Sequence, residues 1–349
     1  MQPLAQLEIT SELLKSVAEI DEFKGRWEAL GNLAPERLSV LRRIATIESV
    51  GSSTRIEGVK LTNEEVNHLL SGLDIRSFES RDEQEVGGYA DVMELIFESN
   101  SQISLSENHI KQLHQDLLRY SEKDQWHRGK YKSLSNNVEA FDEHGKGIGV
   151  VFETASVFDA PRLMSELVDW TSSNLYKNEF HPLFVIAVFV VRFLAIHPFQ
   201  DGNGRLSRAL TTLLLLRTGY DYVPFSSLER IVEENKDHYY RALRSAQSTL
   251  DGDESQLGEW LTFFMHCLVR QKDVLAAKIE RERLMEPLSP LSEKLLSIIR
   301  ENGRVTVRQG VSVTGENRNT IKAHLKELVH GRKLIQNGKG KGTWYELSS

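Results

Sequence analysis

The sequence predicts an all-α fold that carries a small β-hairpin and ends in a separate basic domain. Apolar residues recur at three- and four-residue spacing through most of the 349 residues, which is the period of a helix. In the body of the chain, strand signal is concentrated in 141–153, where a glycine-bearing turn separates two apolar runs. Residues 288–349 hold 11 Lys and Arg against 5 Asp and Glu, although the whole chain has a net charge of −7. An acidic body and a basic tail indicate different partners.

The composition, with 40% hydrophobic and 27% charged residues, is that of an ordinary globular protein. The single cysteine, Cys267, excludes an intramolecular disulfide, and its apolar neighbours predict a buried structural thiol. The first residues lack the features of a secretory signal. The longest apolar stretch, 184–196, is interrupted by Arg192 and is too short for a bilayer. We therefore expect a cytoplasmic protein without a membrane partner, and a homodimer is one of the open oligomeric states.

Successive helices account for the body of the chain. A helix is expected after Ser106, a good N-cap residue, and the periodicity predicts others over 11–30, 35–49, 64–70, 83–98, 162–175, 183–196, 205–218, 232–249 and 256–285. Two prolines in "MEPLSPLS" come just before the charge balance changes, so we place a domain boundary near residue 287. The predicted parts are an N-terminal helical region (1–100), a core (101–250), a connecting helix (251–287) and a terminal domain (288–349).

The stretch "HPFQDGNGRLSR", residues 197–208, follows a very apolar helix and concentrates charge around glycines. The Gly-Asn-Gly sequence at 202–204 permits backbone torsions that point successive N–H groups into one concavity, which favours anions. Helical periodicity resumes at Arg205, so this turn would begin a helix whose dipole also favours negative charge. Arg205 and Arg208 are three apart and could reach neighbouring phosphates with forked donors.

Two further groups in this stretch suggest chemistry. Asp201 would be an odd neighbour for a phosphate unless Mg²⁺ bridged the two. His197, at the end of the preceding helix, can take up a proton near neutral pH. Together these groups indicate phosphoryl or nucleotidyl transfer to a hydroxyl. The alternative is a helix C-cap, a polar turn and an arginine-rich helix start without chemistry.

The same stretch resembles the signature of the Fic-domain family, H-x-F-x-[DE]-G-N-G-R-x-x-R, at every fixed position. The resemblance covers roughly residues 40–245 and implies a Fic-fold helical bundle. Members with this motif typically transfer AMP from ATP to a Ser, Thr or Tyr hydroxyl of a protein, which can be the enzyme itself. The resemblance implies that His197 is the base, that Asp201 is the Mg²⁺ ligand and that Phe199 points into the core. The nucleotide-binding residues that it implies are Asp201, Gly202, Asn203, Gly204, Arg205 and Arg208, with Tyr239 and Tyr240 at the adenine or, equally, in packing.

The segment "WHRGKYKS" and the hairpin at 141–153 together resemble the Fic flap. In the family, this flap lays a target segment beside the active site by strand pairing. Family members often have arginine where this chain has Lys132, which puts that contact in doubt. A structural β-ribbon without a docking role is the alternative.

A second motif, "SSTRIEGV" at 52–59, precedes the first in the chain. If residues 53–57 form one helical turn, Ser53 and Glu57 share a face, and Gly58 ends the turn. The pattern [ST]-x-x-x-E-[GN] resembles the inhibitory motif of Fic proteins that are inhibited from their own N-terminal region. This resemblance implies that Glu57 pairs with Arg208 and displaces the ATP triphosphate from the geometry needed for attack. In some relatives the same glutamate positions a water that removes AMP, so the enzyme could work in both directions.

The basic tail is predicted to form three short helices and a hairpin, and it resembles a winged helix-turn-helix domain. The third helix has an apolar face and a polar face, formed by Ile321, Leu325, Leu328 and Val329 and by Arg318, Asn319, Lys322 and Lys326. Residues 338–342, with two lysines, resemble the tip of a wing. Such domains commonly place the third helix in the DNA major groove, but they also serve packing or dimerisation.

Three functions follow from these observations. The leading one is an autoinhibited protein adenylyltransferase, a nucleotidyltransferase that uses ATP and Mg²⁺. The second is a DNA-binding transcriptional regulator whose Fic domain is an accessory nucleotide sensor. The third keeps the fold but transfers another group, such as phosphoryl or phosphocholine, and the intact signature is better suited to a Mg²⁺–triphosphate.

Overall fold

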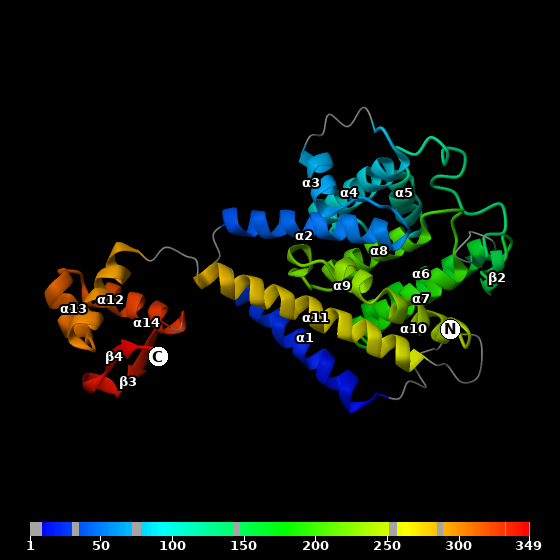
Figure 1. Cartoon of the computed structure of the whole chain (residues 1–349). Coiled ribbons are helices and arrows are strands. Elements are labelled where there is room, and N and C mark those ends of the chain that lie inside the picture. Colours follow the sequence, from blue (N-terminus) through cyan, green and yellow to red (C-terminus); the bar gives the residue numbers. More distant parts are fainter. Residues whose placement is uncertain are drawn as a thin grey trace. The chain divides into compact units, whose positions relative to one another are not determined.

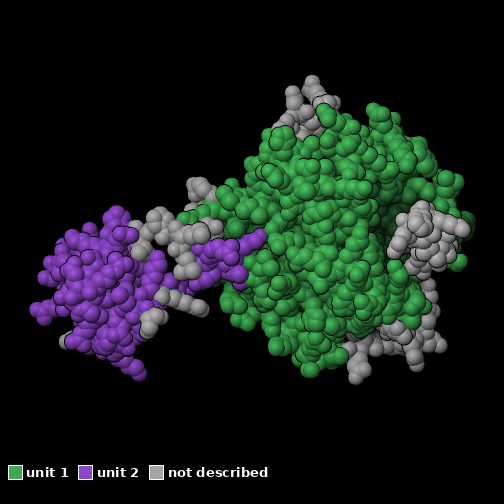
Figure 2. Space-filling model, in the orientation of Figure 1, with its two compact units in different colours: residues 1–275 green, residues 276–349 purple. Residues whose placement is uncertain are grey.

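The computed structural model describes residues 9–29, 35–71, 78–141, 147–250, 257–284, 289–331 and 333–348. The chain divides into two compact units, residues 1–275 and residues 276–349 (Figure 2). The division falls within the last helix of the body, α11 (Leu257–Leu284). None of the described helices is long and apolar enough to cross a membrane.

Unit 1 is built around two helices that are buried along most of their length, α7 and α8. Trp260 of α11 donates from its indole N–H to the Ala187 carbonyl of α7 at 2.8 Å, which fixes α11 against this centre. Helix α1 runs alongside α11 in Figure 1, and Lys272 of α11 pairs with Glu19 of α1 at 3.5 Å. The helices of unit 1 are α1 (Ser11–Ala29), α2 (Pro35–Ile56), α3 (Asn63–Ser71), α4 (Arg81–Ser99), α5 (Glu107–Leu117), α6 (Ala160–Lys177), α7 (Pro182–Ile196), α8 (Asn203–Arg217), η1 (Val223–Phe225), α9 (Leu228–Glu234), α10 (Lys236–Gln247) and most of α11.

Most of the predicted helices are confirmed in type and agree to within two residues at each end. Helix α2 continues to Ile56, seven residues beyond the predicted end, and therefore includes most of the second motif. The single helix expected over 232–249 is wrong, because α9 and α10 are separate helices that meet at Asn235. The Asn235 side chain donates to the Ile231 carbonyl at 2.8 Å, a side-chain bond that competes with the helical backbone pattern.

The predicted hairpin of unit 1 is present as β1 (Val138–Phe141) and β2 (Gly147–Phe152), which pair antiparallel. Val138 lies opposite Phe152, and the register shifts twice along the ladder. The first strand begins three residues before the predicted start at 141. Residues 142–146, which contain the expected turn, lie outside the described residues.

Unit 2 contains the three helices and the hairpin that the sequence predicts. They are α12 (Pro290–Asn302), α13 (Val307–Thr314), α14 (Arg318–His330), β3 (Leu334–Asn337) and β4 (Trp344–Leu347), with η2 (Gly340–Gly342) between the antiparallel strands. Ile321, Leu325 and Leu328 of α14 are buried in the apolar core of this unit. The polar face of α14 is exposed, as predicted. The assignment to the winged-helix class stays a prediction.

Candidate functional site

His197 is presented at the end of α7 by a change in backbone direction. The residue adopts a left-handed conformation, with φ of +51°, and its N–H closes the helix on the Phe193 carbonyl at 2.9 Å. Its Nδ1 lies 3.3 Å from the Leu194 carbonyl, so Nδ1 carries the proton and Nε2 is left as an acceptor. Burial lowers the pKa of His197 to about 4. The imidazole is therefore neutral at pH 7 and able to accept a proton.

The loop after His197 is held by the side chain of Asn203. Asn203 Oδ1 accepts from the Phe199 N–H at 2.9 Å, and Nδ2 donates to the Phe199 carbonyl at 2.7 Å. Phe199 is fully buried, as predicted. The Asn203 side chain therefore shapes the loop through both its oxygen and its nitrogen.

His114, on α5, supports the same loop and was not predicted. Its ring stacks on Phe199 with centroids 3.9 Å apart, and its Nε2 lies 3.0 Å from the Asp201 carbonyl. The Gly129 N–H donates to Nδ1 at 2.9 Å, so Nε2 must carry the proton that reaches Asp201. Burial lowers the pKa of His114 to about 4, which keeps this arrangement at neutral pH. A histidine on an apolar helix face gives no sequence signal for such a role.

Asp201 lies in a cluster of four charges. Its Oδ1 is 3.3 Å from Arg205 Nη2, and its Oδ2 is 3.1 Å from Arg81 Nη2. Glu85 of α4 pairs with both arginines, at 2.8 Å from Arg81 Nε and 2.9 Å from Arg205 Nη1. Burial would raise the pKa of Asp201, but the charges of Arg205 and Arg81 and the bond from the Gly202 N–H together contribute to a net downward shift. Asp201 is therefore ionised at neutral pH.

This cluster changes the role expected of Arg205. Its side chain is only 2% exposed, its Nη2 donates to Asp201, and its Nη1 lies within ion-pair distance of Glu85, while its Nε has no hydrogen-bond partner among the described residues. In this state Arg205 neutralises carboxylates, whereas the resemblance implied phosphates. Arg81 and Glu85 were not predicted, because an i,i+4 ion pair is common on helices and does not identify a site.

Glycines at 202 and 204 shape the start of α8. Gly202 has φ of +78°, a left-handed conformation that favours glycine, and its carbonyl accepts the first helical bond from Leu206. A Cβ atom on Gly204 would collide with Glu57 Oε1. The carboxylate of Glu57 therefore lies directly against the first turn of α8, where the helix dipole favours an anion.

The second motif meets the first at Arg208. Arg208 Nη2 donates to Glu57 Oε1 and to the Ser53 carbonyl, each at 2.8 Å, and Arg208 Nε donates to Ser53 Oγ at 2.8 Å. Gly58, with φ of +104°, follows the end of α2. Burial would raise the pKa of Glu57, but its pairing with Arg208 outweighs burial and lowers that pKa. The structure thus brings Ser53, Glu57 and Arg208 together in an ionised, hydrogen-bonded group.

The two predicted adenine residues differ in accessibility. Tyr239 is 5% exposed, and its ring packs 5.9 Å from Trp260 and 6.0 Å from Phe263. Tyr240 is half-buried, with the Lys236 ammonium 5.9 Å from its ring centroid. Tyr239 is therefore packed in the core, and Tyr240 is the more accessible of the two.

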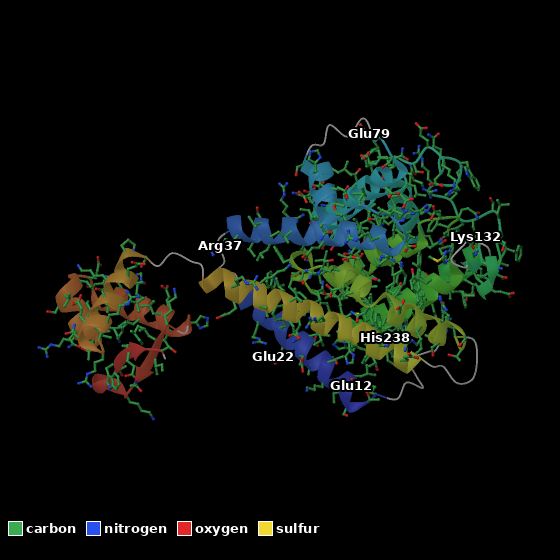
Figure 3. All side chains as sticks on the ribbon, in the orientation of Figure 1. Glu12, Glu22, Arg37, Glu79, Lys132 and His238 are labelled. Carbon is green, nitrogen blue, oxygen red and sulfur yellow. The ribbon has the colours of Figure 1, made fainter. Side chains whose placement is uncertain are left out.

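Lys132 is buried, at 3% exposed, and is labelled close to the hairpin in Figure 3. Its Nζ donates to Asn136 Oδ1 at 2.8 Å, to Thr154 Oγ1 at 2.9 Å and to the Ile196 carbonyl at 3.2 Å. Burial lowers the pKa of this ammonium to about 8. Lys132 therefore connects both ends of the hairpin to the end of α7. Cys267, as predicted, is buried, and burial raises the pKa of its thiol to about 12.

Asp201 can be tested as a ligand for Mg²⁺. Among the described residues, no group of three or more His, Cys, Asp or Glu side chains could hold a metal ion. The carboxylate of Asp201 is 37% exposed and ionised beside the glycine turn at 202–204. Mg²⁺ is commonly held by one or two carboxylates together with substrate phosphates and water. The donor set therefore fits a Mg²⁺ that arrives with a phosphate ligand.

Comparison with known families gives the same assignment as the signature. Residues 104–215 match the Fic/DOC family, and this range contains His197, the glycine turn and Arg208. The chain carries a Fic domain. It is similar to curated relatives named protein adenylyltransferase Fic, with 32% identity over 116 residues in Drosophila willistoni and 26% over 280 residues in Drosophila melanogaster. These alignments cover 33% and 78% of this chain, but only 21% and 51% of the relatives.

Solved structures of Fic proteins share the fold. A Fic family protein from Desulfovibrio desulfuricans superposes with a TM-score of 0.63 and 24% identity, over 98% of each chain. A Fic domain containing signaling protein from Bacteroides thetaiotaomicron superposes with a TM-score of 0.59 and 26% identity, over 74% of this chain and 95% of that one. The helical fold is therefore shared with these Fic proteins over most of this chain.

Proposed function

We propose that this Fic-domain chain is a protein adenylyltransferase that transfers AMP from ATP to a Ser, Thr or Tyr hydroxyl of a protein. The observation that carries the proposal is the neutral His197, whose Nε2 is left as an acceptor six residues before the start of α8. A neutral imidazole in this position can act as general base for a hydroxyl nucleophile. The names of the curated relatives, of which the chain spans a fifth to a half, support the same activity.

The proposed reaction assigns a role to each residue of the site. His197 accepts the proton of the attacking hydroxyl, while the backbone N–H groups at the start of α8 bind the triphosphate. Asp201 would hold Mg²⁺, which supplies charge neutralisation of the triphosphate when bound. Arg208 stabilises the negative charge that develops as pyrophosphate leaves. Asn203 and His114 keep the loop in the geometry that these steps need.

We also propose that the conformation with Glu57 on Arg208 is an inhibited state. Glu57 occupies the guanidinium of Arg208 and the N-terminal turn of α8, the two features expected to bind the end of the triphosphate. ATP could still bind, but its phosphates would be displaced from the in-line geometry. The same carboxylate is a candidate to orient a water for removal of AMP from a modified target.

The function is tested by incubating Glu57→Gly protein with labelled ATP in lysate and by identifying labelled proteins, the chain itself included. The Glu57→Gly, His197→Ala protein is the control. We expect AMP on hydroxyl side chains only when His197 is present. Equal labelling by both proteins would show that His197 is not the base.

The pH dependence of labelling should reflect the lowered pKa of His197. Because burial lowers that pKa to about 4, the base stays unprotonated well below the ordinary histidine range. The labelling rate of Glu57→Gly protein is therefore expected to be constant from about pH 8 to pH 5 and to fall only near pH 4. Rates are measured across this range with circular dichroism as the control for folding. A midpoint near pH 6.5 would contradict the assignment.

We propose nucleic-acid binding by residues 288–349 as a second function. The exposed face of α14 carries Arg318, Asn319, Lys322 and Lys326, opposite the buried face of that helix. An exposed basic helix face is the feature that binds DNA phosphates and bases.

A duplex shift that weakens with salt is expected for the full chain. Lys322→Ala should reduce the salt slope, whereas Lys294→Ala, an exposed lysine on α12, should not. Sequence-preferring binding without labelling by Glu57→Gly protein would favour the DNA-binding regulator. The absence of any shift at low salt would exclude this second function.

A further inference from the structure

A bidentate ion pair connects the last turn of α2 to α9. Arg55 Nε lies 2.7 Å from Glu233 Oε1, and Arg55 Nη2 donates to Glu233 Oε2 at 2.9 Å. The same guanidinium donates to the Leu61 carbonyl at 3.0 Å and to Ser52 Oγ at 3.2 Å. The two side chains are 23% and 27% exposed, so the pair is partly shielded from water. A bidentate pair with these extra bonds fixes the orientation of the Arg55 guanidinium as well as its distance from Glu233.

Gly51 leaves the space that this guanidinium occupies. A Cβ atom at position 51 would lie 2.7 Å from Arg55 Nη1 and 2.7 Å from Asn63 Oδ1. Glycine inside a helix costs about 1 kcal/mol relative to alanine, so a glycine here needs a compensating reason. The room that it gives to Arg55, folded back along α2, is such a reason.

A second contact fastens the same turn to α10. Lys236 Nζ donates to the Ile56 carbonyl at 2.8 Å, and Ile56 is both the last helical residue of α2 and the neighbour of Glu57. The last turn of α2 is therefore held from two helices, α9 and α10. We call Arg55, Glu233 and Lys236 the clasp.

We propose that the clasp is a positioning device that keeps Glu57 on Arg208, and that its opening releases the inhibited state. This inference rests on the autoinhibition proposed above. Glu57 lies one residue beyond the end of α2, in a turn closed by the bonds from the Glu57 N–H to Thr54 and from the Gly58 N–H to Arg55. The position of the last turn of α2 therefore sets the position of the Glu57 carboxylate.

The clasp also provides a route by which a ligand could act on Glu57. Lys236, which holds the Ile56 carbonyl, lies over the ring of Tyr240 on the same helix. A base that binds against Tyr240 would compete for that lysine and would loosen the last turn of α2. The clasp thus connects the candidate adenine position to the inhibitory glutamate.

The test compares self-labelling and hydrogen exchange in Glu233→Gln protein with wild type and with Glu57→Gly protein. We expect Glu233→Gln to raise labelling several-fold, up to about tenfold, because a partly shielded bidentate pair is lost while Glu57 and Arg208 remain. The Glu57 and Gly58 amides should exchange faster. In the Glu57→Gly background the same change should add no labelling.

Arg230→Gln is the matched control, because Arg230 of α9 also pairs with α2, at 2.7 Å from Glu48, but away from the inhibitory turn. Its labelling should stay within about twofold of wild type. Gly51→Ala is a second variant that displaces the Arg55 guanidinium and keeps every charge, and it should behave like Glu233→Gln.

The proposed role of the clasp is overturned if Glu233→Gln and Gly51→Ala proteins show the labelling rate and the hydrogen exchange of wild type while Glu57→Gly protein is active. If Glu57→Gly itself labels no better than wild type, the proposed autoinhibition fails. In that case the hydrogen exchange of Glu233→Gln protein decides. Unchanged exchange at the Glu57 and Gly58 amides overturns the proposed role of the clasp, and faster exchange supports the clasp as the contact that fixes the last turn of α2.

Discussion

Glu57→Gly protein is expected to label itself with AMP about 10- to 100-fold faster than wild type. The substitution removes the carboxylate that accepts from Arg208 at 2.8 Å and that lies against Gly204. A hydrogen bond between charged groups contributes about 1.5–3 kcal/mol, which corresponds to this range. The guanidinium and the first turn of α8 then become available to the triphosphate. The rate is measured with labelled ATP and purified protein.

Glu57→Gln is the matched control for this change. Glutamine keeps the size of the side chain and can still accept a hydrogen bond from Arg208, but it carries no charge. Its labelling should therefore lie between wild type and Glu57→Gly. If all three proteins label equally, the contact between Glu57 and Arg208 has no inhibitory role. If Glu57→Gln matches wild type and Glu57→Gly is active, the bulk of the side chain matters more than its charge.

The parts of the site that could be predicted are those in which neighbours along the chain are neighbours in space. His197, Asp201 and the glycine turn lie within one helix end, one loop and one helix start, so a short pattern defines them. The shared face of Ser53 and Glu57 follows from helical spacing, and α2 does extend through this segment. For the same reason the type of most helices was predictable.

The parts that could not be predicted are pairings across long sequence separation. His114 reaches the Asp201 carbonyl, and Arg81 reaches the Asp201 carboxylate from another helix. Arg55 meets Glu233 across 178 residues. Charged residues at such distances look like any solvated helix face until the packing is known, because hydrophobic periodicity defines which face is buried but not which helix covers it. The break at Asn235 was missed since it depends on one side-chain bond.

Arg208→Ala tests the other side of the same ion pair and should have the opposite effect. Arg208→Ala breaks the ion pair between Arg208 and Glu57, just as Glu57→Gly does. Unlike Glu57→Gly, it also removes the group expected to stabilise the leaving pyrophosphate. In Glu57→Gly protein, labelling should therefore fall about 100-fold or more when Arg208 becomes alanine. In otherwise wild-type protein, Arg208→Ala should show no activation. Both proteins are assayed with labelled ATP, and thermal unfolding checks that they fold.

Arg208→Lys separates charge from geometry. Lysine keeps the positive charge, but its single ammonium cannot reproduce the planar fork in which Nε donates to Ser53 Oγ and Nη2 donates to Glu57 and the Ser53 carbonyl. We expect intermediate labelling in the Glu57→Gly background, with a weaker affinity for ATP. If Arg208→Ala alone labels as well as Glu57→Gly, Arg208 serves only to hold Glu57, and the triphosphate must be stabilised elsewhere. If Glu57→Gly raises labelling and Arg208→Ala abolishes it, the two opposite effects would instead show that Glu57 and ATP compete for the Arg208 guanidinium.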